Sequence, residues 1–382
     1  MIVGILKEPA NETRVSLLPE QVEALIKKGV QVVVETGAGT KASAYDDVYV
    51  AKGAKTVSRA EVISSADILL FIHTINASEL ATAKQGAVTI GVYYPLYNHG
   101  MLDEWNKKNI TCFSLDMLPR TTRAQSMDVL SSQANIAGYK AVLLAANVFP
   151  RYFPMFMTAA GSIAPAKVLI LGAGVAGLQA IATARRLGAV VEVSDTRPAV
   201  KEEVKSLGAK FIEVEGAADA SKAGGYAVEQ SEEYKQKQQQ KIAEAITKAD
   251  IIITTAQIPG KKAPILITNQ MLETMKAGSV IVDLAAATGG NTEVTLNDQT
   301  VVHNGVTIIG NSNLQATMPF DASKMYGKNV INFMQLILTK EGGINLNWED
   351  DLVKGCCITH NGEVVHERVK PLLKEKAKTL IS

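Results

Sequence analysis

Three glycines near the middle of this 382-residue chain restrict its fold more than any other feature. An apolar run over residues 168–171 (VLIL) precedes Gly172, Gly174 and Gly177, and a helix-compatible stretch follows as far as residue 187. A second β-branched run then ends at Asp195. A strand, a glycine turn, a helix and a second strand ending in an acidic residue are the parts of a dinucleotide-binding unit. The motif therefore predicts a parallel α/β sheet around this turn.

Each glycine of the motif has a different expected task. Gly172 permits the tight turn, Gly174 lets the backbone approach a pyrophosphate, and Gly177 lets the helix pack against its strand. The unpaired amides at the helix start, around Val175 and Ala176, would then bind the phosphates. A glycine turn that serves only the packing of an α/β protein is the alternative interpretation.

The end of the second strand predicts which dinucleotide binds. Asp195, with Thr196 beside it, would accept hydrogen bonds from the adenosine ribose hydroxyls, and its charge would repel a 2′-phosphate. This favours NAD(H) over NADP(H). Arg197 leaves a second interpretation open, because its guanidinium could meet a 2′-phosphate or simply cover the adenine.

Strands and helices alternate along the whole chain, which predicts parallel sheets covered on both faces. A connecting helix is expected over residues 129–149 and a last helix over 322–338, before a strand pair around 355–365 that turns at Asn361-Gly362. We expect two Rossmann-like, doubly wound α/β domains, formed by residues 1–137 with 325–382 and by residues 138–324. The expected strands cover residues 2–6, 31–34, 68–72, 88–92, 110–115, 167–171, 190–194, 210–214, 250–254, 279–284 and 306–309.

Composition excludes several other classes of protein. The net charge is +1, which argues against a nucleic-acid-binding surface. The three cysteines, Cys112, Cys356 and Cys357, form no CxxC motif and indicate neither a disulfide framework nor a metal site, so we expect a reducing compartment. The N-terminus lacks the long apolar region of a signal peptide, and no apolar stretch reaches the roughly 18 residues of a membrane span. Direct membrane insertion is therefore not expected.

One segment is longer than a simple connection requires. Residues 215–241 are rich in small and polar residues and contain the flexible pair Gly224-Gly225 beside Tyr226. Long insertions of this kind are commonly functional or disordered. We expect a mobile, functional loop, and a solvated surface loop leading into a charged helix is the alternative.

Several further motifs accompany the glycine turn and give the chain a family resemblance. They are KEP at 7–9, ETRV at 12–15, MLPRTTRAQSMD at 117–128, SSQANIAGY at 131–139, GGY at 224–226, TTAQIPG at 254–260 and VDLA at 282–285. With them the chain resembles the NAD(H)-binding alpha-subunit component of the proton-translocating nicotinamide nucleotide transhydrogenases.

This resemblance implies site residues outside the glycine turn. Arg120, Gln125 and Asp128 would hold the nicotinamide ring, with Ser131 nearby, and Tyr226 with Gly225 would close over the nucleotide. Gln257 stands where the family usually has leucine in the TTALIPG turn. On sequence alone, the segment around Asp128 could also be a loop salt bridge followed by a helix cap.

The resemblance also implies an activity and partners. Hydride would pass between NAD(H) bound here and NADP(H) bound on a partner beta subunit, in the Si-specific/Re-specific type of NAD(P)+ transhydrogenase. A membrane-spanning component would translocate protons, and a homodimer of this chain would attach to it at the cytoplasmic face of the inner membrane. Such a transfer requires positioning rather than a proton acceptor. None of the five histidines lies in these motifs.

Two other functions remain open. Alanine dehydrogenases are similar in both domains but use a lysine where this chain has His73, a histidine after the fourth strand where it has residues 92–95 (VYYP), and an aspartate where it has Ala287. Oxidative deamination requires a proton acceptor beside the hydride, which the substituted positions do not provide. An NAD(H)-responsive regulatory module without chemistry is the second alternative.

Overall fold

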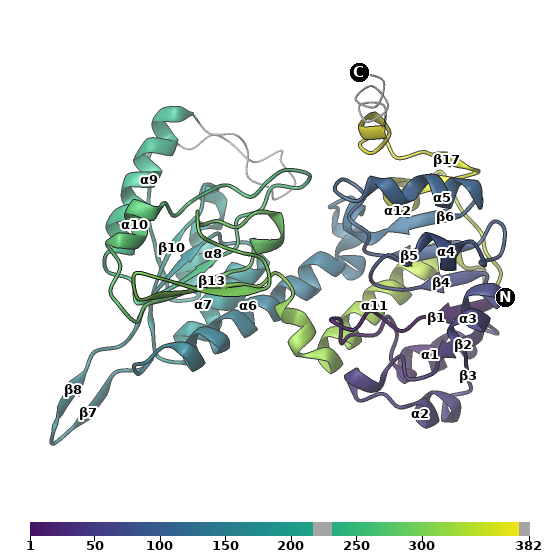
Figure 1. Ribbon diagram of the computed structural model, residues 1–382, viewed down its shortest axis with the longest axis horizontal. Coiled ribbons are helices and arrows are strands. Elements are labelled where there is room, and N and C mark those ends of the chain that lie inside the picture. The colour runs from purple at the N-terminus through teal and green to yellow at the C-terminus, as the bar shows by residue number, and fades with distance from the viewer. Residues whose placement is uncertain (217–230, 374–382) are drawn as a thin grey trace. The chain divides into compact units, whose positions relative to one another are not determined.

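The computed structural model describes residues 1–216 and 231–373, and the chain divides into two compact units. Unit 1 consists of Met1–Gln133 and Met318–Ser382, and unit 2 of Ala134–Thr317. Each unit is built on a mainly parallel sheet with helices packed against it (Figure 1). The α/β class predicted from the sequence is confirmed.

Unit 1 has an eight-stranded sheet in the order β17-β16-β6-β5-β4-β1-β2-β3. Strands β1 to β6 are parallel, whereas β16 runs antiparallel to β6 and β17 antiparallel to β16. The predicted C-terminal strand pair thus forms and extends the sheet of the N-terminal segment. The strands are β1 (Ile2–Ile5), β2 (Gln31–Glu35), β3 (Lys55–Val57), β4 (Ile68–Leu70), β5 (Val88–Gly91), β6 (Thr111–Ser114), β16 (Cys357–His360) and β17 (Glu363–Val364).

One hydrophobic core fills unit 1, and the long helix α11 contributes Tyr326, Val330 and Phe333 to it. The α-helices of unit 1 are α1 (Pro19–Ile26), α2 (Asp46–Ala51), α3 (Arg59–Ser65), α4 (Ala77–Leu80), α5 (Leu102–Lys107), α11 (Pro319–Ile337) and α12 (Asp351–Cys356). Its 3-10 turns are η1 (Thr40–Ala42), η2 (His99–Met101), η3 (Leu115–Met117) and η4 (Thr122–Met127). Helix α6 (Val129–Val148) begins in unit 1 and continues into unit 2.

Unit 2 has a seven-stranded sheet in the order β11-β10-β9-β12-β13-β15-β14, and its strand order reverses between β9 and β12. Ligands of doubly wound folds bind at such a switch point, outside the carboxyl ends of the strands. Leu171 pairs in register with Ser194 and Thr254, so three loops that follow these strands begin at one edge. The strands are β9 (Lys167–Leu171), β10 (Val190–Ser194), β11 (Lys210–Phe211), β12 (Ile251–Thr254), β13 (Val280–Asp283), β14 (Gln299–His303) and β15 (Val306–Gly310).

Alternate residues of each central strand in unit 2 belong to different cores. Val168 and Ile170 of β9 pack in one cluster with α7, whereas Leu169 and Leu171 pack in another with α9. Burial on both faces explains why these strands are apolar throughout. The helices of unit 2 are α7 (Val175–Arg186), α8 (Lys201–Ser206), α9 (Glu232–Ile246) and α10 (Asn269–Glu273), with 3-10 turns η5 (Pro198–Val200), η6 (Ala286–Thr288) and η7 (Leu314–Thr317).

Four strands were not expected from the sequence. These are β3, β14 and the two strands of a hairpin, β7 (Phe156–Thr158) and β8 (Gly161–Ile163), which projects from the seven-stranded sheet of unit 2 (Figure 1). None of them is buried along its whole length, so the continuous apolar signal of a central strand is missing. Strand β14 is also the antiparallel edge of its sheet. In the stretches of chain that the structure describes, no helix combines the length and apolar character needed to cross a membrane.

Candidate functional site

The glycine turn joins β9 to α7 at the carboxyl edge of the seven-stranded sheet. Gly172 has φ +104°, a conformation that favours glycine. A Cβ on Gly177 would lie 1.9 Å from the carbonyl oxygen of Gly172, so no larger residue fits there without displacing the turn. A Cβ on Gly174 would meet no atom of the described residues within 4 Å. The turn therefore requires glycine at two positions and leaves the third accessible.

Helix α7 begins immediately after this accessible position. Gly174 is its N-cap, in an extended conformation, and Val175 and Ala176 are its first helical residues. The first N–H groups of a helix have no partner within the helix and carry the positive end of its dipole. This arrangement of backbone groups fits a pyrophosphate.

Asp195 follows β10 and lies beside the glycine turn. Its Oδ2 accepts hydrogen bonds from the Ala173 amide and Arg197 Nη2, both at 2.7 Å. Its Oδ1 accepts from the Arg197 amide at 2.8 Å and from Arg197 Nε at 2.9 Å. A carboxylate offers about four acceptor positions, so these four bonds occupy them. A ribose hydroxyl must therefore compete with the Arg197 guanidinium for Asp195. Thr196, between the two residues, is half-buried.

The loop after β12 is attached to the glycine turn and to the next strand. Thr255 Oγ1 donates to the carbonyl of Gly172 at 3.1 Å, and Gln257 Nε2 donates to the carbonyl of Leu284 at 3.0 Å. The amide of Gln257 thus makes a bond that the family's usual leucine cannot make. The departure from the family motif is accommodated by a contact to the end of β13.

The sequence-predicted residues of unit 1 lie between β6 and the first turn of α6. Arg120 precedes η4 and Gln125 lies within it, and both side chains are exposed. Helix α11 holds this turn, because Asn329 Nδ2 and Asn332 Nδ2 donate to the carbonyl of Ser126 at 2.9 and 2.8 Å. The loop is therefore fixed on its inner side and exposes polar side chains on its outer side.

Asp128 and Ser131 are brought together at the start of α6. Asp128 Oδ1 accepts from the Ser131 amide at 2.9 Å, and Oδ2 accepts from Ser131 Oγ at 2.6 Å. This is the geometry of a helix N-cap. The capping role considered for Asp128 on sequence grounds is therefore present. Gly225 and Tyr226, the remaining predicted residues, lie outside the described residues, as do residues 217–230 of the loop expected at 215–241. The end of that loop was predicted wrongly, because residues 232–241 are the first turns of helix α9, which the Ser231 side chain caps.

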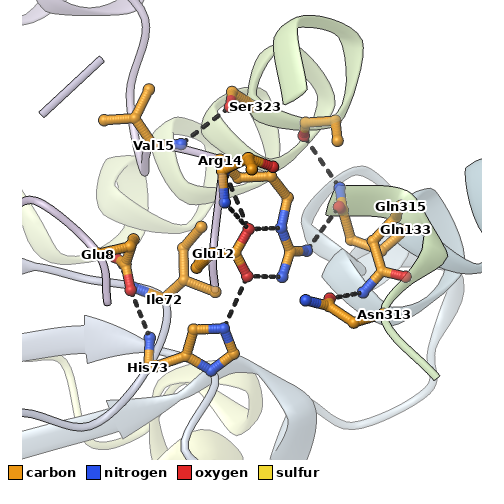
Figure 2. A network of polar contacts seen from close by, with 12 residues as sticks. Glu8, Glu12, Arg14, Val15, Ile72, His73, Gln133, Asn313, Gln315 and Ser323 are labelled. Atoms are coloured by element: carbon orange, nitrogen blue, oxygen red, sulfur yellow. Dashed lines mark hydrogen bonds and ion pairs between the residues drawn. The ribbon is translucent and has the colours of Figure 1, made fainter. Parts of the chain in front are cut away.

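A buried polar network lies near the ETRV motif of unit 1 (Figure 2). Arg14 Nη2 and Nε contact the two carboxylate oxygens of Glu12 at 2.7 and 2.9 Å, and His73 Nε2 lies 2.7 Å from Glu12 Oε2. Burial alone would raise the pKa of Glu12, but the hydrogen bonds from Arg14 and His73 outweigh it and lower that pKa. Sequence reasoning missed this partner of His73, because 61 residues separate it from Glu12.

Glu8 belongs to the same network but has no cation bonded to it in the described structure. Its carboxylate accepts from the amides of Ile72 at 2.6 Å and His73 at 3.1 Å. Burial raises the pKa of Glu8 to about 7, against the opposing effect of these hydrogen bonds. Glu8 can therefore hold a proton near neutral pH.

Family models match both halves of this chain. The model described as alanine dehydrogenase/PNT, N-terminal domain, matches residues 4–137, and the C-terminal domain model of the same family matches residues 141–367. This chain belongs to the alanine dehydrogenase/PNT family.

Individual relatives place the chain within the alanine dehydrogenase/PNT family. An NAD(P) transhydrogenase alpha-subunit protein of Rickettsia prowazekii is 48% identical over 370 residues, which cover 96% of each chain. A crystal structure of transhydrogenase from Sinorhizobium meliloti has a TM-score of 0.87 at 45% identity and covers 96% of this chain and 100% of its own. Alanine dehydrogenase of Bacillus subtilis is 26% identical over 378 residues, covering 97% of this chain and 94% of its own.

The structure places the three positions at which alanine dehydrogenases were expected to differ from this family member. His73 is bonded to Glu12, and Tyr93 after β5 packs its buried ring against Phe71 and Trp105. Ala287 lies in η6, where its amide donates to Ser312 Oγ at 2.9 Å. Neither Tyr93 nor Ala287 supplies a histidine or carboxylate base.

Proposed function

We propose that this chain binds NAD(H) and exchanges hydride with NADP(H) held on a partner beta subunit, as part of a Si-specific/Re-specific transhydrogenase. The observation that carries the proposal is the glycine turn, with Gly174 accessible at the start of α7 and Gly172 and Gly177 in positions that only glycine fits. The high identity to proteins called NAD(P) transhydrogenase subunit alpha supports the same function.

The residues divide between binding and orientation. The amides of Val175 and Ala176 bind the pyrophosphate, and Asp195 with Thr196 binds the adenosine ribose, in exchange for part of its bonding to Arg197. Gln257 and the loop after β12 border the same turn. Gly225 and Tyr226 belong to this proposal through the family resemblance alone.

The loop of unit 1 orients the nicotinamide ring in this proposal. Arg120, Gln125 and Asp128 offer charge and amide contacts suited to a carboxamide and a ribose, and Ser131 fixes Asp128. When bound, NADH supplies the hydride that NADP+ on the partner accepts. No proton leaves an oxygen or nitrogen in that step. The side chains therefore have to hold the ring in one orientation rather than act as bases.

A mixing experiment tests the proposed function. NADPH is added to an acetylpyridine analogue of NAD+ with this chain alone, with the partner subunit alone, and with both together. Reduction of the analogue only in the mixture supports the proposal. Nucleotide binding without transfer in any mixture would favour a regulatory module, and alanine-dependent reduction of NAD+ by the chain alone would favour an amino-acid dehydrogenase.

The proposed assembly is a homodimer attached through its partners to the cytoplasmic face of the membrane, with proton translocation in a membrane-spanning component. Within unit 2, the hairpin β7–β8 supports self-association. Tyr152, Met155, Phe156 and Met157 at this hairpin are 43 to 71% exposed. Exposed apolar side chains gathered at one hairpin are typical of a protein interface.

A further inference from the structure

A buried asparagine lies beyond the end of β13, outside every motif assigned above. Asn291 follows the pair Gly289-Gly290 and is fully buried. Its side-chain amide makes three hydrogen bonds, which use its oxygen and its nitrogen. The three hydrogen-bond partners of Asn291 therefore identify the segment that this side chain holds in place.

All three bonds go to the loop that follows β12. Asn291 Oδ1 accepts from the Ala256 amide at 3.0 Å, and Nδ2 donates to the Ala256 carbonyl at 2.9 Å and to the Pro264 carbonyl at 2.8 Å. The side chain thus pairs with both polar groups of Ala256, as the backbone of a neighbouring strand would. Ala256 lies just after the end of β12, where the regular ladder between β12 and β13 has stopped.

Asn291 is itself held by the end of β13. Its backbone amide donates to Asp283 Oδ2 at 2.6 Å, and the same carboxylate oxygen accepts from Thr295 Oγ1 at 2.7 Å. Asp283 is fully buried, and its Oδ1 accepts from the Ala285 amide at 2.9 Å. A Cβ on Gly290, which has φ +76°, would lie 2.9 Å from Asp283 Oδ2, so glycine lets the chain fold closely around this carboxylate.

The other end of this chain of bonds is the glycine turn. Thr255, next to Ala256, donates its amide to the carbonyl of Leu171 at 2.9 Å and its hydroxyl to the carbonyl of Gly172 at 3.1 Å. A Cβ on Gly172 would lie 2.3 Å from Thr255 Oγ1. Thr255 thus contacts the turn directly, and Asn291 bonds to Ala256, the residue next to Thr255.

We propose that Asn291 is a positioning residue for the dinucleotide site, which fixes the loop after β12 and through it the glycine turn that binds the pyrophosphate. The inference rests on the proposed function, because it takes NAD(H) as the ligand. Loss of the Asn291 hydrogen bonds leaves the nucleotide-binding groups of the glycine turn in place along the chain but lets their positions vary. Its first effect is therefore on nucleotide affinity, before any effect on the hydride step at saturation.

Asn291→Asp tests this role with almost no change in size. The carboxylate can still accept from the Ala256 amide, but it cannot donate to the carbonyls of Ala256 and Pro264. Ile281→Val and Ile281→Ala serve as controls, because Ile281 is a buried residue of β13 that packs in the core cluster with α9. NADH affinity is measured by fluorescence titration, stability by the unfolding temperature, and the loop by hydrogen exchange at Ala256.

The expected result is a rise of about tenfold or more in the NADH dissociation constant of Asn291→Asp, with faster exchange at Ala256. Ile281 variants of equal unfolding temperature should bind NADH within about twofold of wild type. If Asn291→Asp binds as tightly as an Ile281 variant of the same stability, the proposed role is overturned. If wild type itself does not bind NADH, the proposed function is overturned, and the ligand assigned to Asn291 with it.

A second variant covers failure of Asn291→Asp to fold. Thr255→Val keeps the side-chain shape and removes the hydroxyl hydrogen bonds to the carbonyls of Gly172 and Leu171. We expect a rise of about threefold or more in the NADH dissociation constant, at little change in unfolding temperature. Unchanged affinity in this variant would break the argued link between the loop and the turn and would overturn the inference.

Discussion

At the scale of single residues, the site of this family member depends on how its charged side chains are already paired. Asp195, the residue expected to recognise ribose, is bonded through both oxygens to Arg197. The two residues that indicated opposite nucleotides in the sequence are thus joined in one ion pair. Nucleotide preference then depends on how the pair separates, since a free Asp195 favours NAD(H) and a free Arg197 favours a 2′-phosphate.

Replacing Arg197 tests this competition. Arg197→Gln removes the guanidinium from Asp195 and leaves no cation there for a 2′-phosphate. The ratio of the NADPH to the NADH dissociation constant should rise by about three- to tenfold, as measured by calorimetric titration. Lys201→Gln is the matched control, because it removes a half-buried cation four residues along the chain that is paired with Glu213. An equal change of ratio in both variants would show a general charge effect.

Glu8 provides a second prediction at this scale. Its pKa is raised from 4.5 to about 7, so the folded protein binds this proton more tightly than the unfolded chain does. The stabilisation is complete below about pH 4.5 and is lost as the pH rises through about 7. Relative to Glu8→Gln, wild type should lose about 3 kcal/mol of unfolding free energy across this interval. Urea unfolding of both proteins between pH 5 and pH 8 measures the difference, and parallel pH profiles would contradict it.

At the scale of elements, the start of α6 combines a structural and a proposed functional role in Asp128. Asp128→Asn retains an oxygen that can cap the helix, so stability should stay within about 0.5 kcal/mol of wild type, whereas Asp128→Ala should cost about 1 kcal/mol. Both variants, and Gln125→Asn, should slow single-turnover hydride transfer on the order of 100-fold. The NADH dissociation constant should change less than about tenfold.

Stopped-flow transfer to partner-bound NADP+ and NADH titration separate these two roles. If Asp128→Asn transfers hydride at the wild-type rate and only Asp128→Ala is slow, Asp128 acts as a helix cap alone. If affinity collapses while the rate at saturation is preserved, the loop is a binding element and the orienting role is wrong.

The strands of the two sheets differ in how well the sequence could predict them. The central strands β9 and β10 were predicted with the observed bounds. Residues 168–171 of β9 are all buried and apolar, and in β10 the valines on both sides of Glu192 are buried. The edge strand β14 and the hairpin were missed because they are partly exposed. Asn291 was missed because its bonds join segments 27 to 35 residues apart, which no local period records. A glycine pair before a lone asparagine, beyond a buried strand, was the available signal.

At the scale of the whole molecule, the hairpin β7–β8 is the feature that a single chain leaves unexplained. Isolated two-stranded hairpins are marginally stable in water, and this one exposes three residues of β7. Tyr152 and Phe156 stack at 5.2 Å between ring centroids, which orders the base of the hairpin without covering it. A second copy of the chain would cover these rings, and this is the physical argument for the proposed homodimer.

A double substitution in the hairpin tests the dimer. Phe156→Lys with Met157→Lys places two charges on residues that are 43 and 71% exposed, so the folded chain tolerates them, whereas a dry interface does not. The molar mass measured by light scattering at micromolar concentration should fall from that of a dimer to that of a monomer. The chain should remain folded. Val302→Lys, at a 68% exposed residue of β14, is the control and should remain dimeric. A monomeric wild type would contradict the homodimer itself. If Val302→Lys dissociates equally, added charge alone accounts for the result and the hairpin is not the interface.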